Sequence, residues 1–143
     1  MSLALLLRAT GLSLVVLSLF HAALWRMLDW GKEIERLSPL NARVFAVHTF
    51  FIAFVLGSLG LLSLVRPQLL LVPSDLARLL LMSVVVFWLA RLVIQPLVFD
   101  RAMRTGWTRS PALRIGVNFV WIFYIGVYGA ALLRQFDAAA GAP

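Results

Sequence analysis

The chain has 143 residues, of which 62% are hydrophobic, and it carries a formal net charge of +7 and no cysteine. Soluble domains are about 45–50% apolar, so the excess indicates membrane-spanning segments. The missing cysteines exclude disulfides, thiolate catalysis, iron–sulfur clusters and cysteine-ligated zinc. Most of the basic residues lie in or beside short loops, where membrane topology and contact with anionic lipid explain them, which argues against nucleic-acid binding.

The first predicted span covers residues 9–28, and it follows Arg8. A basic residue before an apolar run is also typical of signal peptides. The run continues into Trp25 without a small-residue cleavage site, so we expect a retained helix. In the following loop, Trp30, Ile34 and Leu37 share one helical face. This spacing predicts a short helix on the membrane surface, with a solvated connector as the alternative.

The second predicted span covers residues 40–65 and opens on Ser38 and Pro39. Serine is a favoured N-cap, and proline fits the first helical position because its missing N–H would be unpaired there anyway. Gly57 and Gly60, with Ser58 between them, form a small-residue patch suited to close helix contact.

The third predicted span covers residues 76–99, with Ser74 as its N-cap. Before it, Pro67 and Pro73 stop helix propagation, and the apolar residues 69–72 between them are expected to enter the lipid interface. The fourth span covers residues 111–133, in which Gly126 and Ala130 suggest a second packing seam. We expect the tail, residues 134–143, to be frayed.

These elements predict an all-α fold: a single domain, residues 1–143, that forms a four-helix transmembrane bundle with up-down-up-down topology. Loops at residues 29–38 and 100–110, with the adjoining helix ends, carry eight basic residues, whereas the opposite side carries four. The positive-inside rule therefore places these two loops in the cytoplasm and both termini outside.

Polar residues recur at a similar depth in all four spans. Each lies seven to nine residues from the same membrane side, which is roughly 10–14 Å along a helix. Two further residues, Gln95 and Trp25, lie one helical turn from members of this layer. The predicted intramembrane polar layer consists of His21, His48, Arg91 and Asn118, with Gln95 and Trp25 beside it.

The charge of Arg91 is the most informative part of this layer. A charged residue deep in a span costs about 2.5–3.5 kcal/mol on insertion scales, and none of the six acids lies within a span. Arg91 could snorkel to the headgroups while the other polar residues make interhelical hydrogen bonds, or it could hold a foreign anion. A third interpretation makes His21 and His48 the axial ligands of a b-type haem.

Several short motifs over the chain resemble a loose group of small bacterial four-helix membrane proteins. They comprise His21 with Trp25, Asp29-Trp30, Leu37-Ser38-Pro39-Leu40-Asn41, Val47-His48, and Phe87-Trp88 with Arg91 and Gln95. The resemblance implies a bacterial inner membrane and brings no activity with it.

No catalytic constellation, nucleotide loop or metal motif stands out in the sequence, so we expect no enzyme activity, resident cofactor or metal. The favoured function is a non-catalytic accessory or scaffold subunit that binds a lipid or another small ligand at the polar layer. Such a protein would work in the lipid bilayer as a homo-oligomer or within a larger membrane complex. The alternatives are a haem- or quinone-binding electron-transfer protein and a small anion or proton-coupled transporter that uses Arg91.

Overall fold

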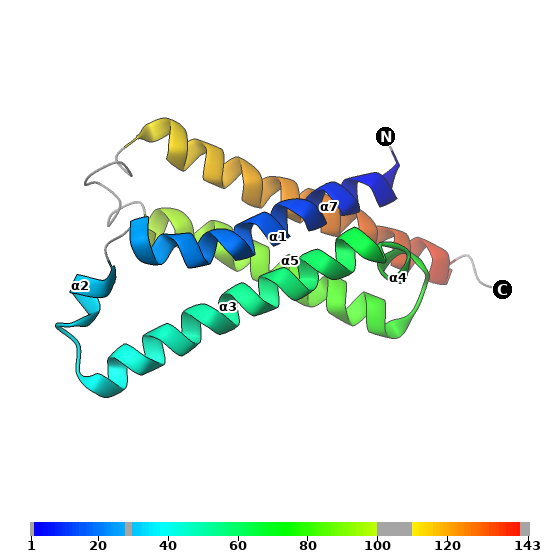
Figure 1. The fold of residues 1–143 in the computed structure, drawn as a ribbon. Helices are drawn as coiled ribbons and strands as arrows, with labels where there is room; N and C mark the ends of the chain where they lie inside the picture. The colour runs from blue at the N-terminus through cyan, green and yellow to red at the C-terminus, as the bar shows by residue number, and fades with distance from the viewer. Residues whose placement is uncertain (1, 28–29, 100–109, 141–143) are drawn as a thin grey trace. The chain divides into compact units, whose positions relative to one another are not determined.

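The computed structural model describes residues 2–27, 30–99 and 110–140, and the regular elements in these ranges are all helices (Figure 1). Four of them are long and apolar enough to cross a membrane, so the all-α fold with four membrane-length helices is confirmed and the chain is a helical membrane protein. The elements are α1 (Leu3–Met27), α2 (Trp30–Ile34), α3 (Pro39–Val65), α4 (Gln68–Leu71), α5 (Asp75–Ile94), η1 (Gln95–Phe99) and α7 (Pro111–Ala140).

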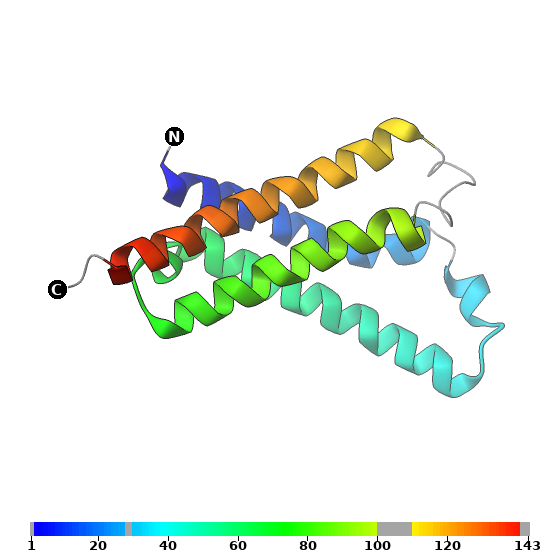
Figure 2. The same ribbon diagram turned by 180° about the vertical axis from the view of Figure 1, so that it is seen from behind.

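The helices form two compact units. One unit, here the α1–α3 pair, covers residues 7–67, and the other, the α5–α7 pair, covers residues 68–143 with residues 1–6. Within each pair the two long helices run antiparallel (Figures 1 and 2). Each pair is thus the helical hairpin that a short connection between two spans favours.

Glycines bring α1 and α3 into close contact. A Cβ atom added at Gly11 would lie 2.5 Å from the Leu64 nitrogen and 2.6 Å from the Gly60 oxygen. Two turns away, the hydroxyl of Ser18 donates a 2.7 Å hydrogen bond to the Ala53 carbonyl. The close contact predicted at Gly57 and Gly60 is confirmed, with Gly11 as the partner that the sequence did not indicate.

Both predicted serine caps are present. The Ser38 hydroxyl accepts a hydrogen bond from the Asn41 N–H at 3.4 Å, and the Ser74 hydroxyl accepts one from the Ala77 N–H at 3.1 Å. Pro39 occupies the first turn of α3, as expected. These contacts satisfy N–H groups that the first turn of a helix would otherwise leave unpaired.

The third span is not α-helical throughout, as its predicted range of 76–99 implied. The α-helix ends at Ile94, and residues Gln95–Phe99 form a π-helical turn. Pro96 explains the change, because it lacks an N–H and its ring would clash with the carbonyl four residues earlier. A wider turn accommodates both effects and leaves Gln95 at the junction.

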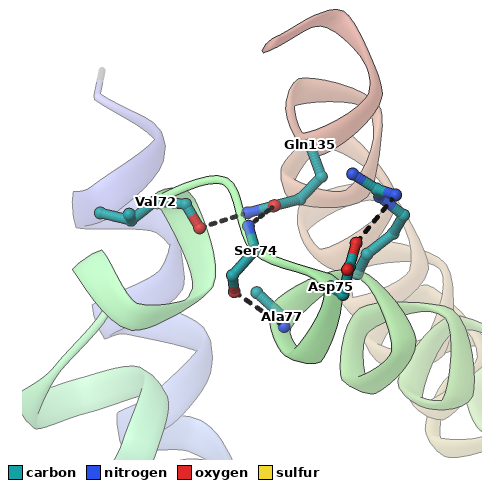
Figure 3. Close-up of polar contacts among 6 residues, drawn as sticks. Val72, Ser74, Asp75, Ala77 and Gln135 are labelled. Atoms are coloured by element: carbon teal, nitrogen blue, oxygen red, sulfur yellow. Dashed lines mark hydrogen bonds and ion pairs between the residues drawn. The ribbon is translucent and has the colours of Figure 1, made fainter. Parts of the chain in front are cut away.

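The expectation of a frayed tail is wrong up to residue 140, because α7 continues to Ala140. Gln135 is fully buried and explains this extension. Its Nε2 donates to the Leu70 and Val72 carbonyls at 2.9 and 3.1 Å, and its Oε1 accepts from the Ser74 N–H at 3.0 Å. Figure 3 shows the contacts with Val72 and Ser74. One side chain therefore holds the end of α7 against the turn between α4 and α5.

The connecting segments contain short helices. The loop helix predicted at Trp30 is present as α2, and the Trp30 ring packs edge-on against Phe45 with centroids 4.9 Å apart. In the second loop, α4 buries Leu70 and leaves Leu69 exposed. The third predicted loop lies outside the described residues, except for Ser110. The membrane-surface position of the first two loops stays a prediction.

Candidate functional site

The α5 side of the candidate site follows from residue spacing. Trp88, Arg91 and Gln95 are three and four residues apart, which places them on one face of the helix. Trp88 and Gln95 are each only 1% exposed, and Arg91 between them is half-buried. This face packs toward α7, the helix with which α5 makes its main contact (Figure 2).

The α7 side consists of aromatic residues at helical spacing. Trp121, Tyr124 and Tyr128 are buried, and Asn118 lies one turn before Trp121. Figures 1 and 2 show α5 and α7 diverging from the α4 end toward residues 99 and 110.

An aromatic stack joins the two helices. The Trp88 and Trp121 rings lie 5.0 Å apart at an interplanar angle of 18°, and Tyr124 meets Trp88 edge-on at 4.7 Å. Such pairs contribute about 0.5–1.5 kcal/mol each beyond the area that they bury. The stack thus fixes the rotational orientation of α5 relative to α7, and it forms an aromatic surface beside Arg91.

Arg91 contacts this aromatic stack directly. Its guanidinium carbon lies 5.3 Å from the centroid of the Trp121 ring, which is within cation–π range. The sequence led us to consider histidine, asparagine, glutamine, carbonyl groups, snorkelling or a foreign anion as partners for this charge. The aromatic partner was missed, although a tryptophan three residues before Arg91 was a usable signal.

Hydrogen-bond donors accompany the cation. The indole N–H groups of Trp88 and Trp121 are buried and have no hydrogen-bond acceptor within the described part of the chain. A buried donor without an acceptor loses about 1–3 kcal/mol relative to a paired one. The site therefore combines a cation with two N–H donors, a set that suits the oxygen atoms of a carbonyl, carboxylate or phosphate group.

The remaining residues of the predicted polar layer have other partners. The Nδ1 atom of His21 lies 2.8 Å from the Leu17 carbonyl, and the Asn118 amide donates to the Arg114 carbonyl at 3.1 Å. Both bonds stay within one helix. His48 is exposed on α3, and the Trp25 side chain lies outside the described residues.

The structure thus places Arg91 against an aromatic cluster on the α5–α7 pair, with the buried Gln95 one turn further along α5. His21 and His48 belong to the α1–α3 pair, so the layer across all four helices stays a prediction. Among the described residues, no group of three or more histidine, aspartate or glutamate side chains could hold a metal ion.

The ligand chemistry of the site has to be argued from these residues. Comparisons of the chain with models of protein families, with curated proteins and with solved structures found no match.

Proposed function

We propose that the protein is a non-catalytic integral membrane protein that binds a small oxygen-rich ligand between α5 and α7. The binding residues form the polar–aromatic cluster, which consists of Trp88, Arg91, Gln95, Trp121 and Tyr124. In this proposal the chain is an accessory or scaffold subunit, and the ligand is a lipid or another small molecule with a carbonyl, carboxylate or phosphate group.

The observation that carries the proposal is the position of Arg91 over Trp121, 5.3 Å from the ring centroid, in a cluster where the indole N–H groups of Trp88 and Trp121 have no acceptor among the described residues. An aromatic ring on the face of a guanidinium leaves the N–H groups at its edge suitably placed for bidentate contact with an oxyanion. The Trp88 ring stacks on Trp121 and is itself buried, so one side of the contact is apolar, which strengthens electrostatic attraction. These features favour binding of an acceptor group.

The side chains of the cluster favour binding over catalysis. They comprise two indoles, a guanidinium, a carboxamide and a phenol, and none is a strong general base near neutral pH. A tryptophan, arginine and glutamine set can orient a ligand and neutralise its charge. This chemistry supports the accessory or scaffold role over an enzymatic one.

The proposal places the chain in a bacterial inner membrane, with residues 29–38 and 100–110 in the cytoplasm and both termini outside. The excess of basic residues near those two loops supports this orientation. Arg91, nine residues before Asp100, then lies in the cytoplasmic half of the bilayer. Partners in the same membrane, either further copies of the chain or a larger complex, complete the proposed role.

Thermal unfolding of the purified, delipidated protein tests the proposal. A bacterial polar lipid extract should raise the midpoint temperature of thermal unfolding of the wild-type protein. A ligand at 100 times its dissociation constant stabilises the folded state by about 2.7 kcal/mol. Arg91→Leu should lower this response by the share that the α5–α7 site contributes. Trp121→Phe, which keeps a ring but removes the N–H, should reduce it in part.

The matched control is Arg134→Leu, because Arg134 is an exposed arginine on α7 outside the cluster. This variant should respond to lipid as the wild type does. An Arg91→Leu protein that gains the same stabilisation as the wild type would refute the site. A Soret absorption band that disappears in His48→Ala would instead establish the haem-binding alternative.

A further inference from the structure

A hollow lies on the face of α3 that points away from α1. Five residues line it: Arg43, Val44, Val47, His48 and Phe51. The residues that approach α1 are Ala53, Gly57 and Gly60. At 100° per residue, the three apolar lining residues fall on the opposite side of the helix. The hollow therefore belongs to a surface that α1 does not cover.

The hollow is large enough for part of a lipid molecule, with a volume of about 290 Å³. Its apolar lining is open, since Val44, Val47 and Phe51 are each more than half exposed. The lining spans eight residue steps, which is about 12 Å along the helix axis. On a membrane-spanning helix, a surface of this shape and polarity lies against lipid chains.

Charge identifies the kind of lipid. Arg43 is the only charged residue of α3, and it lies four residues after Pro39, or about 6 Å into the helix. His48 lies about 7.5 Å deeper on the same surface. Among the described residues, neither side chain has a hydrogen-bonding or ionic partner. The surface thus presents a cation near the membrane surface, then an imidazole, and then an apolar groove deeper in the membrane. This order matches a phospholipid with an anionic headgroup.

We infer that the α3 hollow binds one anionic phospholipid. Its phosphate pairs with Arg43, the histidine ring donates to an ester oxygen, and one acyl chain lies along Val44, Val47 and Phe51. A second copy of the chain is a poorer occupant, because a two-fold contact through this face would bring two Arg43 side chains together. This inference is independent of the proposed site between α5 and α7.

Native mass spectrometry of the delipidated protein tests the inference, with dioleoylphosphatidylglycerol and dioleoylphosphatidylcholine added in turn. The wild type should retain one phosphatidylglycerol molecule in preference to phosphatidylcholine. Arg43→Gln should weaken retention about fivefold, the effect of one basic side chain at an anionic surface. Inorganic phosphate should not compete, because it lacks the acyl chain.

Two further variants separate a built site from general attraction. Val47→Trp keeps the charge but fills the hollow, so it should weaken retention at least as much as Arg43→Gln. Arg66→Gln changes an exposed arginine at the other end of α3 and should leave retention within twofold.

Equal losses in Arg43→Gln and Arg66→Gln would overturn the inference, since they would indicate unspecific attraction alone. Wild-type retention in Val47→Trp would overturn it as well. So would a dimer that dissociates in Arg43→Gln without any change in lipid retention.

Discussion

The contact between α1 and α3 at Gly11 gives the sharpest stability prediction. A Cβ atom at this position would meet three backbone atoms at 2.5–2.9 Å, whereas Cβ atoms in proteins rarely approach other atoms closer than 3.4 Å. Backbone atoms cannot move aside by a rotamer change, so Gly11→Ala must push the two helices apart locally by about 0.9 Å. Overpacking of this kind typically destabilises by about 1–3 kcal/mol, and the backbone obstruction places Gly11 at the upper end.

Neighbouring glycines provide a graded series for the same measurement. At Gly60 the three nearest atoms all lie at 2.9 Å, so the loss should be smaller than at Gly11. At Gly57 the added atom meets only the Ser18 side chain, at 2.9 Å to its hydroxyl oxygen, and the loss should be smaller again. Gly126 is the control, because an added Cβ atom there meets nothing within 4 Å.

Reversible unfolding in mixed micelles, with the free energy of unfolding compared between variants, is the appropriate assay. Gly126→Ala should be neutral or stabilising by about 0.5–1 kcal/mol, since alanine favours a helix over glycine. The free energy of unfolding of Gly11→Ala must be well below that of the wild type. Equal free energies for Gly11→Ala and Gly126→Ala would show that α1 and α3 do not cross at this glycine.

Two further predictions concern the turn between α4 and α5. Gln135→Leu should destabilise by about 1–3 kcal/mol, because it leaves the buried Leu70 carbonyl unpaired, and hydrogen exchange at the Ser74 amide should accelerate. The exposed Gln68→Leu should leave that exchange unchanged, and a wild-type exchange rate in Gln135→Leu would contradict the predicted role. Ser74→Ala should lower the free energy of unfolding by about 1 kcal/mol through loss of the α5 cap, whereas Ser83→Ala, at an exposed hydroxyl within α5, should have little effect. Similar losses in both serine variants would argue against a specific cap.

The starts of α3 and α5 could be predicted from the sequence because their signals are local, whereas α1 begins at Leu3, six residues before its predicted start at residue 9. A serine followed by proline, or a serine followed by aspartate, supplies the cap whatever the rest of the fold does. Helix ends were less predictable, because they depend on tertiary partners. The α7 helix continues to Ala140 past the predicted end at 133, since Gln135 finds its partners on a segment more than sixty residues earlier in the chain.

Small-residue motifs show the same limit. The patch at Gly57 and Gly60 does pack closely, whereas Gly126 and Ala130 are exposed within the α5–α7 pair, so the predicted seam on α7 stays a prediction. The two motifs look alike in the sequence. Which of them forms a contact depends on the partner helix, and only Gly60 has a glycine opposite it in α1.

The candidate site was predictable in part. Arg91 and Gln95 stood out because a charge in an apolar span is costly and the two residues share a face. The stack of Trp88, Trp121 and Tyr124 could not be derived, because helices that are apolar on all sides give no periodicity to show which face packs. Aromatic residues are common in such helices, and their pairing depends on how α5 and α7 are rotated.

The sequence alone determined that this is an all-α chain with four membrane-length helices, because span length and helix capping are local properties of composition. It also determined that no carboxylate lies within residues 76–99, the span that contains Arg91. Only the tertiary structure decided that this charge lies over Trp121 and that Gly11 meets Gly60. In helices without an amphipathic pattern, facing residues are selected by the fit of side chains across the interface, which one helix by itself does not encode.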